Sequence, residues 1–227
     1  MKAVSFSLWG DIPMYCAGAI RNAELMRNVY PEWTMVVWAD STVPKEIVAT
    51  LKNLGVEIRN PKCSNGMFWR FAIADDSKVE AFIIRDTDSR IGPREAGSVN
   101  QWLESGKAAH VIRDHPSHSP VMSGGLWGAR KGAIPNMQKL IDACASSKME
   151  SDRRTSYNSD QIFLRESVWP IVKHNCLQHD LCFHDKFQGA QPFPSKFGDD
   201  RFVGEVWDAN DQPRSFDWQM RINWQEA

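Results

Sequence analysis

Two aspartates, Asp86 and Asp88, follow directly on the apolar run Phe82-Ile83-Ile84 and Arg85. Such a run predicts a buried strand, and open α/β sheets place their ligands at the carboxyl ends of their strands. Two carboxylates so close together raise each other's proton affinity unless a cation lies between them. Hard oxygen ligands favour Mg²⁺ or Mn²⁺, which commonly keep substrate phosphates as further ligands. The spacing therefore predicts a metal site, and the alternative is a solvated turn, because Asp and Ser also form turns.

The composition is that of a globular protein of 227 residues, with 27 basic and 28 acidic side chains and a net charge of -1. Since there is no basic block, bulk charge offers no argument for a nucleic-acid partner. No stretch approaches the ~20 apolar residues that cross a bilayer, and the first apolar run is too short for a secretory signal. Five scattered cysteines without a C-x-x-C pair favour reduced thiols. We expect a cytoplasmic protein.

The elements that must position the aspartates alternate along the first ninety residues. We expect strands at residues 2–8, 34–38, 56–58 and 79–85. We expect helices at residues 15–30, 44–55 and 68–75. Strands that alternate with helices of about ten residues indicate βαβ units and a parallel sheet. The first part of the chain is therefore predicted to be a nucleotide-binding half.

The second part is predicted from weaker patterns. We expect helices at residues 94–105, 134–147 and 159–172, the last capped by Ser159 and kinked or ended near Pro170. We expect strands at residues 108–113 and 121–127, with Gly124 and Gly125 forming a bulge or a close backbone approach to a ligand. From His174 onward the chain is predicted to be irregular and to pack across the open end of the sheet.

These motifs, in this order, resemble the GT-A glycosyltransferases, and more closely a little-characterised bacterial and viral branch of them. The segments that carry the resemblance are Trp69-Arg70-Phe71, Arg85-Asp86-Thr87-Asp88-Ser89-Arg90, Arg113-Asp114-His115-Pro116, Gly124-Gly125-Leu126-Trp127-Gly128, Ser159-Asp160-Gln161 and His179-Asp180. The resemblance covers residues 3–208. It implies one GT-A domain over residues 1–227, a three-layer α/β/α sandwich with a mixed, mostly parallel sheet. Its parts are a nucleotide-binding half at 1–92, an acceptor half at 93–173 and a C-terminal closure at 174–227.

The resemblance also implies an activity. It predicts a metal-dependent hexosyltransferase that moves a sugar from a nucleotide-sugar donor to a sugar or glycan acceptor. Mn²⁺ or Mg²⁺ would bridge the donor diphosphate to Asp86 and Asp88. His179 is the first choice for a further metal ligand and His184 the second. Glycogenin-like relatives carry that histidine just before a Phe-x-Gly element, where this chain has Arg201.

Donor-binding roles are implied for Arg70, Arg85, Thr87, Gly124 and Gly125. A guanidinium at residue 70 suits the donor phosphates, because it stays charged and offers a planar fork of donors. The alternative is a helix-surface arginine paired with an acidic residue at 75 or 76. Residue 85 could equally neutralise a buried acid, and glycines let main-chain N–H groups come close to a sugar.

Catalytic roles are implied for Asp160, Gln161 and Asp114. If the reaction inverts the anomeric centre, Asp160 or Asp114 could take the proton of the acceptor hydroxyl. If it retains the configuration, Asp160 and Gln161 would stabilise charge on the sugar instead. The alternative is a first-turn acid that complements the helix dipole. His115 and His118 could bind acceptor hydroxyls, and Tyr15 could contact the nucleoside.

Two other functions also fit parts of the sequence. A phosphatase resembling the haloacid-dehalogenase class would use Asp86 as the nucleophile and a later acidic pair such as Asp199-Asp200 for Mg²⁺. That motif normally follows the first strand, whereas here a long βαβ region precedes it. A non-enzymatic carbohydrate-binding protein would explain the ten tryptophans but leaves the paired aspartates unexplained.

Overall fold

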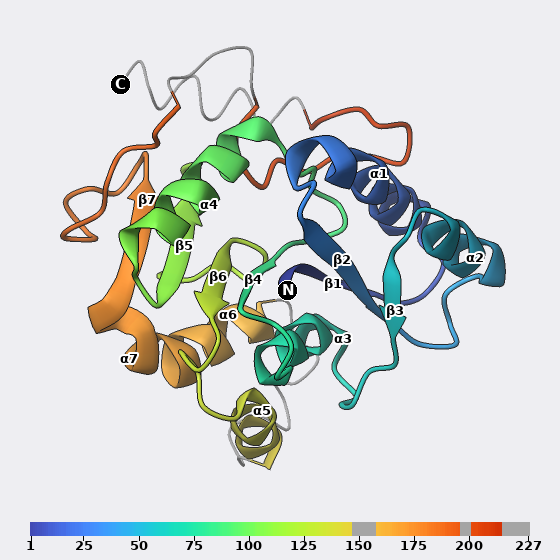
Figure 1. Ribbon diagram of the computed structural model, residues 1–227, viewed down its shortest axis with the longest axis horizontal. Helices are drawn as coiled ribbons and strands as arrows, with labels where there is room; N and C mark the ends of the chain where they lie inside the picture. Colours follow the sequence, from blue (N-terminus) through green and yellow to red (C-terminus); the bar gives the residue numbers. More distant parts are fainter. Residues whose placement is uncertain (147–157, 196–200, 215–227) are drawn as a thin grey trace.

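A computed structural model describes residues 1–146, 158–195 and 201–214. Its centre is a sheet of seven strands in the order β3-β2-β1-β4-β6-β5-β7 (Figure 1). The strands are β1 Lys2–Leu8, β2 Trp33–Ala39, β3 Glu57–Arg59, β4 Ala81–Ile84, β5 Ala109–Arg113, β6 Trp127–Arg130 and β7 Cys176–Asp180. Neighbours run parallel except at β6, which is antiparallel to both β4 and β5. The predicted mixed, mostly parallel sheet is confirmed.

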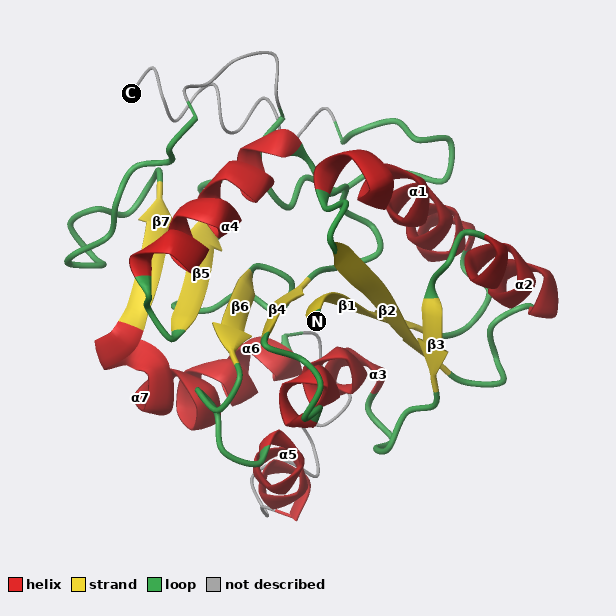
Figure 2. Cartoon of the chain, viewed as in Figure 1, coloured by secondary structure: helices red, strands yellow, loops and turns green. Residues whose placement is uncertain are grey.

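Helices cover both faces of this sheet (Figure 2). One face carries α1 Pro13–Val29, α2 Lys45–Asn53 and α4 Pro93–Ser105. The other carries α3 Gly66–Trp69 with the 3-10 turn Arg70–Asp75, α5 Met137–Ser146, α6 Ser159–Phe163 and α7 Trp169–Val172. The arrangement is the expected three-layer α/β/α sandwich. No helix in the described parts of the chain is long and apolar enough to cross a membrane.

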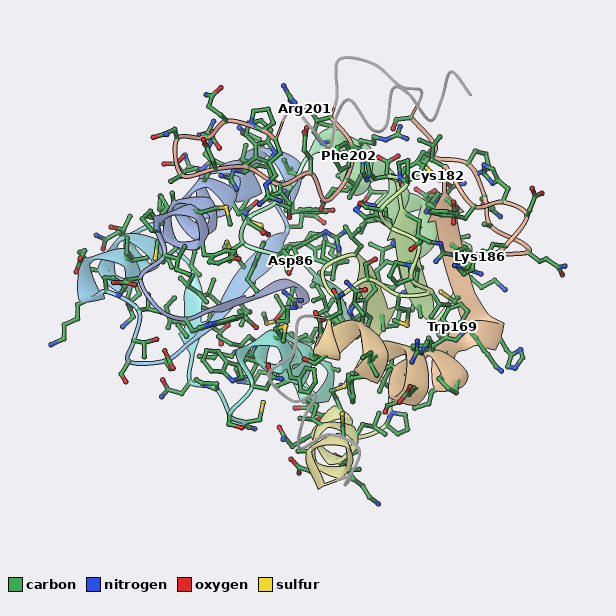
Figure 3. All side chains as sticks on the ribbon, turned by 180° about the vertical axis from the view of Figure 1, so that it is seen from behind. Asp86, Trp169, Cys182, Lys186, Arg201 and Phe202 are labelled. Atoms are coloured by element: carbon green, nitrogen blue, oxygen red, sulfur yellow. The ribbon has the colours of Figure 1, made fainter. Side chains whose placement is uncertain are left out.

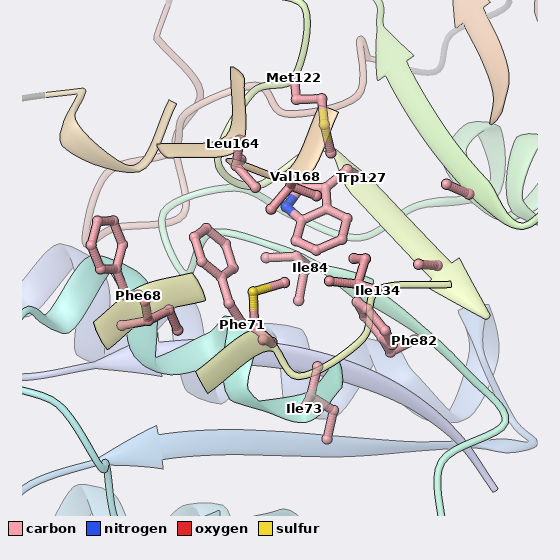
Figure 4. Close-up of a cluster of buried hydrophobic side chains, with 14 of the residues drawn as sticks. Phe68, Phe71, Ile73, Phe82, Ile84, Met122, Trp127, Ile134, Leu164 and Val168 are labelled. Carbon is pink, nitrogen blue, oxygen red and sulfur yellow. The ribbon is translucent and has the colours of Figure 1, made fainter. Parts of the chain in front are cut away.

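The two cores follow from the alternation of side chains along each strand. On β4, Ala81 and Ile83 pack under α1 and α4, whereas Phe82 and Ile84 pack under α3 and α6. Figure 4 shows the second core, where the rings of Phe71 and Phe82 pack against Trp127. The same alternation turns the residues that follow β4 to opposite faces in succession.

Local chemistry explains the helix ends. Pro13 and Pro93 occupy the first turns of α1 and α4, where a missing N–H is no loss. Gly106 ends α4 with a φ of 71°, a left-handed conformation that glycine adopts without steric cost. Between α6 and α7 the chain forms a π-helical turn, Leu164–Val168, just before Pro170. The helical path thus changes its type just before Pro170 and continues to Val172 rather than ending at that proline.

Three sequence predictions were wrong in detail. Strand β6 begins only at Trp127, so Gly124 and Gly125 lie in a turn before it rather than in a bulged strand. The N-cap of α6 is Asn158, with a φ of 73°, and not Ser159. The stretch after His174, expected to be irregular, contains β7.

Candidate active site

A pocket of about 800 Å³ opens at the carboxyl ends of β1 and β4. It is lined by the ends of these strands, by the turn before β6 and by the start of α6. Residues 201–214, called the C-terminal segment below, also contribute to the lining. Asp86 lies near the middle of the molecule, below the segment that carries Arg201 and Phe202 (Figure 3). Parallel α/β sheets bind their ligands at this edge, so the pocket stands where the sequence placed the site.

The aspartate pair lines this pocket as expected. The Asp86 side chain keeps 43% of its surface exposed. Asp88 is more deeply placed, and burial together with the charge of Asp86 raises the pKa of its carboxyl to about 6. The main-chain oxygen of Asp88 accepts a hydrogen bond of 2.8 Å from the N–H of Trp207, which ties the C-terminal segment to the site.

Arg70 joins two walls of the pocket. Its Nη1 pairs with Oδ1 of Asp86, and its Nη2 lies 2.9 Å from Oδ2 of Asp160. Ser7 Oγ accepts from the Arg70 N–H at 3.0 Å, and Ser5 Oγ donates to the Arg70 carbonyl at 2.8 Å, so β1 fixes its backbone. The alternative of a helix-surface arginine is wrong, because the side chain is buried and faces the pocket.

The paired glycines give these carboxylates room. A methyl group on Gly124 would overlap Oδ2 of Asp160 and come within 2.8 Å of Arg70 Nη2. On Gly125 it would overlap Oδ2 of Asp86 and come within 2.6 Å of its Cγ. Only residues without a Cβ fit a turn pressed against two acidic side chains. The turn therefore approaches the carboxylates of the site closely, and its approach to a bound ligand stays a prediction.

Asp160 and Gln161 enter the pocket from the first turn of α6. The N–H of Gln161 donates to Oδ1 of Asp160 at 2.8 Å. Burial is the main cause that raises the pKa of Asp160; the charge of Asp86 adds to it, and Arg70 acts in the opposite sense. The acid of the first turn thus faces the site and also fits the helix dipole.

Two other predicted residues lie outside the pocket. Asp114 is fully buried, and both its oxygens accept hydrogen bonds from Arg94, at 2.7 and 2.9 Å. Arg85 points to the opposite face of the sheet, where its Nε lies 3.1 and 3.2 Å from the oxygens of Glu95. The structure thus gives Arg85 the other role considered, neutralising a buried acid. Thr87, by contrast, lines the pocket.

Neither candidate histidine accompanies the aspartates. His179 lies on β7, three strands from β4, and is fully buried. Its Nδ1 lies 2.7 Å from His110 Nε2 and its Nε2 lies 2.8 Å from Gln101 Oε1, so both ring nitrogens are engaged. His184 is exposed in the loop after β7. Within the described residues, no group of three or more His, Cys, Asp or Glu side chains could hold a metal.

Sequence reasoning missed one prominent residue, Trp9. Its indole lines the pocket and is 44% exposed. It stands edge-on to Trp69, with ring centroids 5.7 Å apart, and a methyl group on Gly66 would come within 2.6 Å of it. The available signal was a tryptophan directly after the first strand. Tyr15 and His118, suggested from their positions, also line the pocket, as do Gly204 and Val206 of the C-terminal segment.

The charges of the lining residues bear on what the pocket can hold. One guanidinium, Arg70, stands against the carboxylates of Asp86, Asp88 and Asp160, which gives a formal charge of -2. A diphosphate would be repelled by this charge. The hard oxygens of Asp86 and Asp88 suit Mg²⁺ or Mn²⁺, which would offset it and take its remaining ligands from phosphate and water. The residues present therefore fit such a cation.

The fold is that of GT-A glycosyltransferases. A glycosyltransferase involved in the glycosylation of the major capsid of PBCV-1 is 12% identical, with 79% of this chain and 81% of that one covered at a TM-score of 0.51. The galactosyltransferase LgtC, in complex with donor and acceptor sugar analogs, is 13% identical. The match covers 79% of this chain and 73% of that one, with a TM-score of 0.51. The glycosyltransferase GlyE of Streptococcus pneumoniae TIGR4 is 18% identical. The match covers 82% of this chain and 46% of that one, with a TM-score of 0.51. No family model and no curated protein matches the sequence.

Proposed function

We propose that this protein is a metal-dependent glycosyltransferase that moves a sugar from a nucleoside-diphosphate donor to a hydroxyl acceptor. The observation that carries the proposal is the pair Asp86 and Asp88, which follows β4 and lines an 800 Å³ pocket in a GT-A fold. The fold alone leaves the activity open, because one fold hosts many functions. The chemistry of the pocket residues therefore has to supply the rest of the argument.

Asp86 and Asp88 would hold Mn²⁺ or Mg²⁺ together with the donor diphosphate. Once bound, the cation neutralises the charge that grows on the diphosphate as the sugar–phosphate bond breaks. Thr87, between the two aspartates, and Gly124 and Gly125 opposite them complete the donor side of the pocket. We assign neither His179 nor Arg85 to the donor or the metal, because His179 pairs with His110 and Gln101, and Arg85 pairs with Glu95 on the opposite face of the sheet.

Asp160 and Gln161 line the same pocket as the aspartate pair, and Arg70 links Asp160 to Asp86. A carboxylate there can stabilise the positive charge that builds on the sugar ring, or take the proton of an acceptor hydroxyl. Both roles need Asp160 to be ionised, and the ion pair with Arg70 favours that state. Asp114 is no longer a candidate for the base, because Arg94 holds both of its oxygens.

The nucleoside is assigned to the end of β1. Trp9 offers an exposed indole that packs against Trp69 and Gly66, and Tyr15 lines the same pocket. A flat base stacks well on a fixed aromatic ring. Ser117 and Ser119, which also line the pocket, suit the hydroxyls of a sugar acceptor.

Metal-dependent ligand binding tests this proposal. The melting temperature of the full chain should rise with UDP or GDP in the presence of Mn²⁺, because a ligand that binds only the folded state stabilises it by about 2.7 kcal/mol at a hundred times its Kd. EDTA and Asp88→Asn should abolish the rise. Asp185→Asn, an exposed aspartate in the loop after β7, should keep it. A panel of nucleotide sugars, screened for hydrolysis with Mn²⁺, then identifies the donor.

The same experiments separate the competing functions. A phosphatase would turn over a generic phosphomonoester and lose this turnover in Asp86→Asn. Its second acidic pair, Asp199-Asp200, lies outside the described residues. A carbohydrate-binding protein would bind glycans equally well with and without EDTA. Binding of nucleoside diphosphates that ignores both Mn²⁺ and Asp88 would rule out the metal-dependent transferase.

A further inference from the structure

One guanidinium holds two acidic residues that come from distant parts of the chain. Arg70 follows α3, Asp86 follows β4, and Asp160 lies ninety residues from Arg70, in the first turn of α6. The side chain of Arg70 is only 6% exposed. Its Nε has no hydrogen-bond partner within the described residues, so the two terminal nitrogens carry its contacts. Arg70 therefore divides its charge between the two walls of the pocket.

The surroundings leave this guanidinium little freedom. The hydrogen bonds of its main chain to Ser5 and Ser7 fix where the side chain starts. Gly124 and Gly125 press against the carboxyl groups from the other side, with no space for even a methyl group. The arginine and the two acids thus form a packed triad, defined here as Arg70, Asp86 and Asp160.

Asp86 is at the same time a proposed metal ligand. A carboxylate oxygen that pairs with a guanidinium has less negative charge to offer a cation, and a fixed positive charge next to the site repels Mn²⁺. Resting on the function proposed above, we propose that Arg70 competes with the divalent cation for Asp86. Binding of the cation loosens the Arg70–Asp86 contact and leaves Arg70 to Asp160.

This competition couples the two sides of the pocket. When the cation takes Asp86, the full charge of Arg70 becomes available to Asp160 and to the donor phosphates nearby. By linkage, whatever draws Arg70 toward Asp160 favours the cation to the same extent. Arg70 is thus a positioning residue: when the cation occupies the metal site, Arg70 pairs with Asp160 alone and holds its carboxylate in place.

Direct titration with Mn²⁺ alone, followed by electron paramagnetic resonance on the full-length chain, tests the competition. Arg70→Met removes the charge and keeps most of the stem, and it should bind Mn²⁺ about tenfold more tightly than the unmodified chain. Asp160→Asn leaves Arg70 with Asp86 as its one acidic partner in the triad, and it should bind Mn²⁺ several-fold more weakly. Arg165→Met, an exposed arginine paired with Glu166, controls for the loss of one positive charge and should leave the affinity unchanged.

The outcomes are distinct. Weaker or equal binding in Arg70→Met overturns the competition, because Arg70 would then merely hold Asp86 in place. Unchanged binding in Asp160→Asn also overturns it, and this variant decides the matter if circular dichroism shows that Arg70→Met does not fold. If neither the unmodified chain nor Arg70→Met binds Mn²⁺, even with UDP or GDP, the metal site of the proposed function fails as well.

Discussion

The imidazole rings of His110 and His179 meet between β5 and β7, with Nε2 of His110 2.7 Å from Nδ1 of His179. The amide oxygen of Gln101, 2.8 Å from His179 Nε2, can only accept a hydrogen bond. His179 therefore carries its proton on Nε2, and His110 donates to its Nδ1. The ring of His110 also stacks on Trp102, with centroids 5.5 Å apart. Both rings are buried, which disfavours a charge on either of them.

This pair predicts a loss of stability in mild acid. Burial, with the charge of Arg94, lowers the pKa of His179 to about 4, and burial, with the charges of His179 and Arg85, lowers that of His110. The unfolded chain takes up these protons near pH 6.5, so stability is full above that pH and falls as the pH drops toward 4. Between pH 6.5 and 5 we expect His179 alone to cost roughly 1.5 kcal/mol of unfolding free energy, and His110 acts in the same direction.

Urea unfolding at several pH values checks this expectation. His179→Gln should be less stable at pH 7 but should lose less stability on acidification than the unmodified chain. His174→Gln, at an exposed histidine just before β7, should follow the unmodified chain at every pH. Parallel curves for all three proteins would show that the buried pair does not set the pH dependence.

Trp9 should contribute to nucleoside binding and not to diphosphate binding. Stacking of a base on an aromatic ring is worth about 1–3 kcal/mol, so Trp9→Ala should weaken UDP or GDP binding about tenfold in calorimetry with Mn²⁺. Pyrophosphate, which lacks the base, should bind this variant as it binds the unmodified chain. The affinity of Trp9→Phe for UDP or GDP should lie between that of the unmodified chain and that of Trp9→Ala. An equal loss for pyrophosphate would mean that Trp9 only maintains the shape of the pocket.

Gly125→Ala should damage the metal site without a large change in fold. The added methyl group would overlap the carboxyl of Asp86, which must then move. We expect the Mn²⁺-dependent rise in melting temperature with UDP or GDP to disappear. Gly97→Ala, inside α4, is the matched control, since among the described residues outside its own helix its methyl group would meet only Pro194 Cγ, at an ordinary 3.6 Å. That change should keep the rise and add up to about 1 kcal/mol of stability. Normal nucleotide binding in Gly125→Ala would contradict the proposed position of the donor.

Much of the first half of the fold could be predicted because its longer strands are rich in apolar and β-branched residues and end at clear turn residues. The predicted first strand agrees with β1 residue for residue, and the predicted strand at 34–38 lies within β2. Strand β7 could not be found in this way. Three of its five residues are polar, and they are buried because partners from other elements satisfy them, such as Arg113 at 2.5 Å from Asp180. Pairing of that kind leaves no periodic signal in the sequence.

The residues of the candidate site likewise fall into those that local sequence predicts and those that only tertiary packing brings together. Asp86 and Asp88 were predictable because two residues of spacing after one strand decide where they point. The partnership of Arg70 with Asp160 spans ninety residues and depends on how α6 packs against the sheet. His179 was chosen through a resemblance in chain order, but its strand lies at the far side of the sheet from β4. Local spacing therefore identified the proposed metal ligands, and only the tertiary structure identified their neighbours.

Asp114 should prove to be a structural residue. Its two oxygens hold the guanidinium of Arg94, and Oδ2 also accepts from the N–H of Val203 at 2.9 Å, which attaches the C-terminal segment. Breaking a buried ion pair costs about 3–5 kcal/mol, so Asp114→Asn should lower the unfolding free energy by about 3 kcal/mol in urea denaturation. Well below its melting temperature, its kcat should change far less than that of Asp160→Asn. A general base would show the reverse, with normal stability and a kcat reduced by about 10²–10⁴, and that result would return Asp114 to the catalytic machinery.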